Sequence, residues 1–395
     1  ISGNNITIVG DTFRNIGSDV LGENSVLIAA DSLIEQNWVA SHHTINDSAR
    51  ISGFFNITRN TETAHVTRSS TIASNSGNVT LMTQGTFRNT ASDIFAGNNI
   101  QINADTVEIS DGVHQSANLS GSGGFSASAS QAGWNYSQTE FTETTQRSSN
   151  LVAGNNLTIG GAINFETGET IGGNSINITG SNLIANNDLT LTADNINIKA
   201  GEYTNTQNTT GFGVNIAASG LNPSISVSRY TGEGNQTIFN PSNLIANNIL
   251  IQSTSAGAGN TNIIASNIWA NDSIDINTAN LSISGDYAPF NTEMNFASFG
   301  VAADIMNGGA SINAAFQRSE TKGAEYVSSN LNAKNINLNS ANQSIEGTNI
   351  NGNAINPQKQ RIKNSTNFGR GISVNPSTGA VSVRGNFKDT INHEH

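Results

Sequence analysis

Short stretches in which apolar and polar residues alternate recur along the chain, each introduced by a pair of Asn, Asp or Gly residues. The phrase occurs at residues 4–8, 98–102, 155–159 and 187–191. Alternation with a period of two sends successive side chains to opposite faces of a strand, so each phrase predicts a short β-strand with one buried face. A phrase that returns this often indicates a structural unit that stacks on itself. The pattern therefore predicts a solenoid.

Residues 181–200 contain one complete unit, with three short strands that are each followed by an Asn, Asp or Gly corner. Within it, Leu189 and Leu191 fall on one side of a strand and Thr190 on the other. Asn, Asp and Gly tolerate the left-handed backbone that tight corners need. A chain that turns after every strand coils upon itself, with parallel coils about 4.8 Å apart. We therefore predict a right-handed parallel β-helix with the apolar residues inside.

Longer segments with a different pattern interrupt the coils. They lie at about residues 36–70, 111–150, 201–241 and 285–327, and a last one covers residues 351–395. Such segments are too long to be ordinary connections. Most contain two alternating runs separated by turn residues, which is typical of a β-hairpin. We expect an all-β fold over residues 1–350, a β-helix with extruded β-hairpin insertions, followed by a final hairpin.

The composition narrows the classes of partner. Only 12% of the residues are charged, the net charge is −12 and the pI is near 4.8, so the chain lacks the basic footprint that nucleic-acid binding needs. The absence of cysteine excludes disulfides and Cys-based zinc sites. Because the first residue falls in mid-repeat, we expect the chain to be part of a longer protein.

Candidate catalytic and metal-binding residues are sparse. Parallel β-helices can carry polysaccharide-active sites, but these need clustered carboxylates, whereas neighbours such as Asp272 and Asp275 are typical of corners or solvated strands. The His42–His43 pair has no evident third metal ligand. We therefore predict a non-enzymatic protein without cofactor or metal, and keep a polysaccharide-active enzyme as the weakest alternative.

Asn residues at the corners have a structural interpretation. Stacked on equivalent corners of successive coils, Asn98, Asn155 and Asn187 are expected to form hydrogen-bond ladders between side-chain amides.

The hairpins carry the functional hypothesis. Five apolar residues alternate with small or polar ones in the third insertion: Phe212, Val214, Ile216, Ile225 and Val227. Membrane-spanning strands need about 9–11 residues with this alternation, so these side chains are candidates for lipid contact. In the alternative interpretation, the hairpins lie back on the β-helix as an added sheet and shield one of its faces.

The phrase at residues 181–191, the following Ile-x-Ile-x-Ala-Gly at 196–201 and the Thr/Ser/Gly-rich insertions together resemble the haemagglutinin repeats of two-partner-secreted exoproteins. That family includes filamentous haemagglutinins and contact-dependent growth inhibition toxins. The resemblance covers nearly all of residues 1–350. It implies a monomeric filament segment that is secreted through a cognate outer-membrane transporter by way of a missing N-terminal domain, and displayed on the bacterial surface.

The resemblance implies two possible roles. In the first, the segment engages the outer membrane or a surface receptor of a target cell during contact-dependent toxin delivery. In the second, it is an adhesin shaft that binds host-cell glycans or receptors. The chain contains neither the Val-Glu-Asn-Asn signature nor a recognisable toxin domain, so the toxin itself is not expected here.

Overall fold

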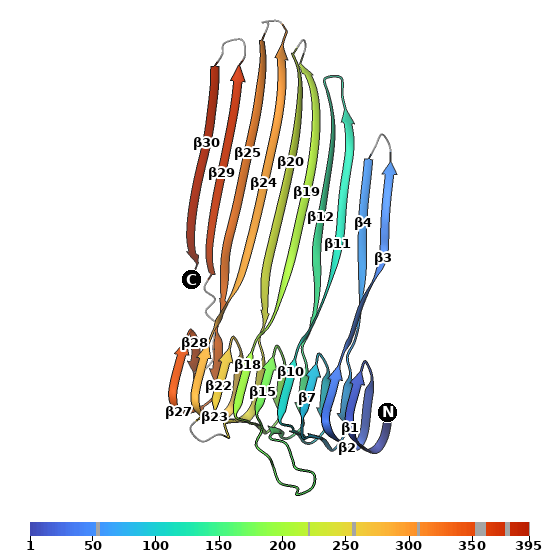
Figure 1. Ribbon diagram of the computed structural model, residues 1–395, viewed down its shortest axis with the longest axis vertical. Helices are drawn as coiled ribbons and strands as arrows, with labels where there is room; N and C mark the ends of the chain where they lie inside the picture. Colours follow the sequence, from blue (N-terminus) through green and yellow to red (C-terminus); the bar gives the residue numbers. More distant parts are fainter. Residues whose placement is uncertain are drawn as a thin grey trace.

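The fold consists of a coiled rod with a wall of hairpins rising from one side (Figure 1). The computed structural model describes residues 1–52, 56–219, 222–254, 258–305, 309–351, 361–375 and 380–394. The described residues form thirty β-strands and no α-helix, and the strands belong to one sheet of twenty and another of ten. No helix long and apolar enough to cross a membrane occurs among the described residues.

The rod consists of parallel coils. Its strands are β1 (Ser2–Ile16), β2 (Asp19–Asn37), β5 (Thr71–Ser74), β6 (Asn78–Thr83), β7 (Thr86–Thr90), β8 (Asp93–Ala96), β9 (Ile100–Asn103), β10 (Thr106–Ser110), β13 (Asn150–Ala153), β14 (Leu157–Gly160), β15 (Ser175–Thr179), β16 (Asn182–Ala185), β17 (Asp188–Thr192), β18 (Asn195–Lys199), β21 (Asn243–Gln252), β22 (Asn260–Ile264), β23 (Asn267–Ser284), β26 (Ser329–Asn332), β27 (Asn335–Glu346) and β28 (Thr348–Asn351).

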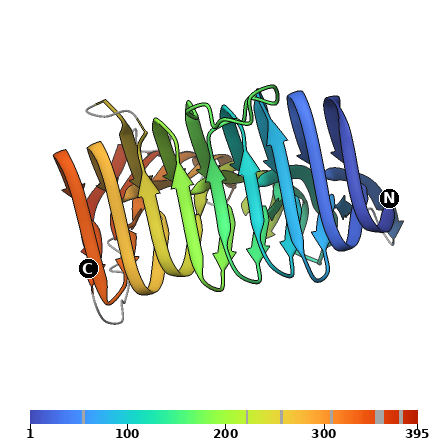
Figure 2. The ribbon, with the colours of Figure 1, turned by 90° about the horizontal axis from the view of Figure 1, so that it is seen from below.

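Equivalent residues of successive coils lie directly above one another. Ile100 pairs with Leu157, Leu157 with Leu189, and Leu189 with Ile249. All four side chains are buried in one continuous core that runs along the rod. Figure 2 shows the coils in succession. The predicted fold class, an all-β parallel β-helix with hairpin insertions, is confirmed.

The insertions form a second sheet. Its strands are β3 (Val39–Ser52), β4 (Asn56–Arg68), β11 (Gly112–Ala127), β12 (Gln131–Arg147), β19 (Gly201–Ser219), β20 (Asn222–Asn240), β24 (Asp286–Asp304), β25 (Gly309–Val327), β29 (Arg361–Asn375) and β30 (Ala380–Glu394). Parts of the expected last hairpin, residues 352–360 and 376–379, lie outside the described residues.

Neighbouring hairpins pair with each other as well as within themselves. β4 pairs with β11, β12 with β19, β20 with β24 and β25 with β29, all antiparallel, so the hairpins make one continuous sheet. This sheet extends away from the rod (Figure 1). Because the sheet stands away from the rod, the alternative in which the hairpins lie back on the rod is wrong. The strands are also longer than the pattern suggested, with 19 residues in β19.

The spacing of the rod matches that of the hairpin sheet. Through the stacked strands β5, β8, β13, β16 and β21, two coils separate one hairpin from the next. Two coils advance the rod by about 9.6 Å, which is the width of two paired strands in a sheet. Each hairpin therefore leaves the rod where it can pair with its neighbour.

A half-buried carboxylate lies at the roots of two hairpins. Asp111 precedes β11 and accepts a hydrogen bond from Gln146 Nε2 at 2.9 Å. Gly201, at the start of β19, makes room for it, since a Cβ there would come within 1.9 Å of the Asp111 carboxylate. Burial raises the pKa of Asp111, while hydrogen bonds from Gln146 and Asn240 lower it to a smaller extent.

The Asp111 carboxylate should make stability depend on pH. Because its folded-state pKa is raised, its favourable contribution is present at low pH and is lost as pH rises through that pKa. As pH rises from about 4, near the ordinary pKa of an aspartate, we expect the urea midpoint of the wild type to fall relative to that of Asp111→Asn, which keeps an acceptor without the charge. A difference between the two proteins that stays constant with pH would contradict this assignment.

Candidate interaction surface

The predicted Asn corners lie on the rod, where each side chain contacts the preceding coil. Asn98 donates from Nδ2 to Asn78 Oδ1 at 3.0 Å, and Asn155 donates to Asn99 Oδ1 at 3.1 Å. Asn187 donates to Asn156 Oδ1 at 3.2 Å. These bonds join successive coils, as the structural interpretation of the corners expects.

A longer ladder, which the sequence analysis missed, runs at the start of the Asn-Leu phrases. Each Asn donates to the one on the preceding coil at 2.8–2.9 Å, through the series Asn150, Asn182, Asn243, Asn267, Asn330 and Asn349. The repeated Ser-Asn-Leu triplets at residues 181–183 and 242–244 were the available signal. Their equivalence becomes visible once the stacking register is known.

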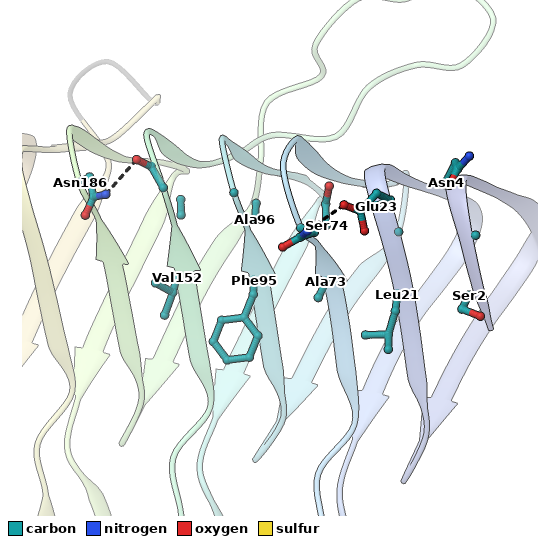
Figure 3. A pocket seen from close by; sticks show the side chains of 16 residues that line it. Ser2, Asn4, Leu21, Glu23, Ala73, Ser74, Phe95, Ala96, Val152 and Asn186 are labelled. Atoms are coloured by element: carbon teal, nitrogen blue, oxygen red, sulfur yellow. Dashed lines mark hydrogen bonds between the residues drawn. The ribbon is translucent and has the colours of Figure 1, made fainter.

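A groove lies along the N-terminal half of the rod (Figure 3). It has a volume of about 730 Å³, and side chains from successive coils line it. Exposed Leu21 and Phe95 lie on its floor, and Glu23 on its rim accepts a hydrogen bond from Asn75 at 2.8 Å. Glu23 is the one titratable side chain in the lining. The groove therefore has the chemistry of a binding surface and lacks a pair of groups for acid–base catalysis.

The five candidate hairpin residues share one face of the hairpin sheet. Val214 lies opposite Val227 and Ile216 opposite Ile225, and residues that lie opposite or two apart along a strand point to the same face. The register extends this face across neighbouring hairpins. We call it the apolar face, and define it by three rows: Ala132, Ile216, Ile225, Val301 and Ile312; Phe125, Trp134, Val214, Val227, Phe299 and Ala314; and Tyr136, Phe212, Arg229, Ala297 and Phe316.

The apolar face is open to solvent. Ile216 is 52% exposed, Phe299 52% and Phe316 58%. Some of its aromatic rings contact one another, since Trp134 stacks on Tyr136 with ring centroids 6.3 Å apart and meets Phe212 at 6.1 Å. Six strands about 4.8 Å apart and three rows give a patch of roughly 400 Å², a size that often marks an interaction site.

The opposite face differs in the same region. Gly133, Asn215, Ser226 and Gly300 form one row there, and Asn135, Gly213, Ser228 and Ser298 form the next. Small and polar side chains thus back the large apolar ones, and larger side chains, including Met294 and Phe296, begin nearer the rod. The outer part of the hairpin sheet is therefore amphipathic.

Acidic side chains end the apolar face on the side towards the rod. Glu233 lies opposite Glu293 and Glu293 opposite Glu320, four residues along their strands from the row that contains Phe212. Arg318 contacts Glu293 at 3.0 Å and Glu320 at 3.9 Å, and Lys322 also pairs with Glu320. A hydrogen bond from Asn295, together with Arg318, lowers the pKa of Glu293. Glu293 and Glu320 therefore have cationic partners, whereas Glu233 makes no ion pair among the described residues.

Metal and catalytic candidates from the sequence do not assemble into a site. In the part of the chain that the structure describes, no three His, Asp or Glu side chains are placed to hold a metal ion. Asp272 pairs with Lys334 at 3.8 Å, while Asp275 accepts a hydrogen bond from Asn337. The His42 side chain lies outside the described residues. The two carboxylates therefore have structural partners.

Comparison with known families identifies the repeat. The family model described as hemagglutinin repeat matches residues 130–284 and 223–364, which together make up more than half of the chain. The chain belongs to the hemagglutinin repeat family. No curated protein and no solved structure matches it. Hemagglutinin repeats of this kind are typical of filamentous haemagglutinin-like exoproteins and are generally structural rather than enzymatic.

The long Asn ladder makes a stability prediction. Asn243 donates to Asn182 and accepts from Asn267, so Asn243→Ala leaves both partners unsatisfied at a half-buried position. We expect a loss of about 1–3 kcal/mol in the free energy of unfolding, measured by urea denaturation. Asn208→Ala is the control, because exposed Asn208 makes no side-chain hydrogen bond among the described residues. Equal effects of the two substitutions would refute the ladder's role.

Proposed function

We propose that this chain is a non-enzymatic segment of a secreted bacterial surface exoprotein, and that it engages the outer membrane of a target cell during contact-dependent toxin delivery. Membership of the hemagglutinin repeat family supports the secreted filament. Secretion would depend on a domain outside this chain that a cognate outer-membrane transporter recognises. The hairpin sheet would then be carried along the shaft as the surface that meets the other cell.

The apolar face is the observation that supports membrane contact. Its exposed side chains, such as Ile216 and Ile225, come from successive hairpins and are held in register by backbone pairing. A soluble shaft needs no such surface, because its core is already buried inside the rod. Exposed apolar area of this size is stabilised by transfer out of water, at about 25 cal/mol for each Å² removed.

A second function, an adhesin shaft for host-cell glycans or receptors, is favoured by the groove on the rod. Its floor presents exposed Phe95, while amide and carboxylate groups such as Asn75 and Glu23 lie at its edge. Aromatic surface combined with fixed polar groups is the chemistry that orients a bound ligand. A polysaccharide-active enzyme has no comparable support, since the lining offers a single carboxylate.

The membrane function is tested by co-flotation of the protein with outer-membrane vesicles. Ile216→Asp combined with Val227→Asp places two carboxylates on the apolar face, and we expect flotation to fall at least tenfold because charge is costly in an apolar lipid environment. Far-ultraviolet circular dichroism should be unchanged, since both positions are exposed.

Asn215→Asp combined with Ser228→Asp is the matched control. It adds the same charge with the same diagonal spacing on the opposite face of the same two strands, and it should float like the wild type. Equal flotation of all three proteins would contradict the proposal. Binding to glycans that survives both double substitutions would instead support the adhesin function.

A further inference from the structure

One cation on the apolar face lacks a counter-charge. Arg229 lies between Phe212 and Ala297 in its row and is exposed, and it makes no ion pair or side-chain hydrogen bond among the described residues. Arg59 lies on β4 on the same side of the sheet, one row nearer the rod than Arg229, and is also exposed and unpaired in the described part of the chain. Glu233 is four residues from Arg229, about 13 Å along the strand. The apolar face thus combines hydrocarbon with free guanidinium groups.

We infer that the apolar face binds flat on a lipid leaflet, with Arg59 and Arg229 holding lipid phosphate groups and the opposite face left in water. This inference rests on the proposed membrane function and specifies its geometry and its lipid chemistry. Guanidinium groups bind phosphate oxygens through parallel hydrogen bonds. In a lipid leaflet the phosphate groups lie at the border of the acyl region. The acyl region can therefore contact the apolar rows while the phosphates contact the arginines.

A second copy of the chain fits the apolar face less well. Two apolar faces packed against each other and centred on the three rows would bury Arg229 with no carboxylate from either copy, because the acids lie about 13 Å beyond its row, where Arg318 and Lys322 pair with Glu293 and Glu320. Burying an unpaired charge in this way is strongly unfavourable. A phosphate-bearing surface supplies the missing counter-charge.

The position of Arg229 also favours flat binding over strands that cross the bilayer. Arg229 is seven residues from Asn222, where β20 begins, or about 24 Å along the strand. In a crossing strand of about 9–11 residues that starts there, Arg229 would be the eighth residue and would lie on the lipid side, where the cost of arginine rises from about 0–1 kcal/mol near the interface to about 2–4 kcal/mol at the midplane. Flat binding buries one face to a depth of about 5–10 Å and leaves Arg229 at the phosphate level.

The orientation is tested by depth measurements on labelled protein. The chain has no cysteine, so Ile225→Cys, Ala297→Cys and Ser226→Cys each accept one fluorophore. With lipids that carry a quencher at a known depth, flat binding predicts similar shallow depths for the labels at 225 and 297, and a label at 226 that stays in water. Flat binding would be overturned if the label at 225 lay much deeper in the bilayer than the label at 297. Burial of the label at 226 would overturn it as well.

The phosphate contact is tested with two kinds of vesicle. Arg229→Gln should weaken binding to phosphatidylglycerol–phosphatidylethanolamine vesicles about fivefold, the ~1 kcal/mol that one arginine contributes near such a surface, and Arg59→Gln with Arg229→Gln about 25-fold. Arg50→Gln is the control, since Arg50 is exposed on the opposite face. On digalactosyldiacylglycerol vesicles, which lack phosphate, all four proteins should bind alike.

Each further outcome has a definite meaning. Equal binding of Arg229→Gln and wild type to the phosphate-bearing vesicles would overturn the phosphate contact and leave the membrane function standing. Failure of the wild type to bind any vesicle would remove the proposed membrane function itself. A dimer in lipid-free solution that Arg229→Gln strengthens would identify a second copy as the occupant and overturn the inference.

Discussion

The rest of the structure depends on one match of spacings. Coils of the rod and strands of a sheet are both held about 4.8 Å apart by backbone hydrogen bonds. Because two coils separate each hairpin from the next among the first four, and each hairpin contributes two strands, the rod and the hairpin sheet advance together. The coil spacing of the rod therefore sets the positions at which the hairpins pair into the second sheet.

This match of spacings explains how the apolar face arises from ordinary side chains. A single hairpin exposes a few apolar residues, such as Ile216 and Val227, which would be ordinary on any protein. Pairing of β20 with β24 places Phe299 beside Val227, and the same register continues through β25. Rows of apolar side chains then cross several hairpins. The surface is a property of the repeat, and the unpaired Arg229 adds a positive charge to it.

Much of this architecture can be predicted from the sequence, because its signals are local. Period-two alternation locates Leu189 and Leu191 inside the rod, and the same alternation places Phe212, Val214 and Ile216 on one face of a hairpin. Pairing between hairpins was missed because it depends on residues far apart in the chain. The two-coil spacing was implicit in the lengths of the segments, but it becomes an argument only once the number of coils is known.

The chemistry of the surface was less predictable. Whether an arginine is paired depends on strands that meet through the sheet register, so the contrast between paired Arg318 and free Arg229 could not be predicted from their local sequences. The Asn182–Asn243 contact shows the same limitation, since it joins residues 61 positions apart. The excursion at residues 161–174 between β14 and β15, which contains no regular strand, was also missed.

The continuous hairpin sheet can be tested directly by cross-linking, since the chain has no cysteine of its own. Val227→Cys with Phe299→Cys places two thiols on directly opposed residues of different hairpins, and Val214→Cys with Val227→Cys does so within one hairpin. Opposed Cβ atoms in a sheet lie about 4.5–5.5 Å apart, so mild oxidation should join both pairs, and should be faster at whichever of the two is the closer, non-hydrogen-bonded pair. Cross-linking within the hairpin but not between hairpins would show that the hairpins stand apart, and would contradict the shared sheet.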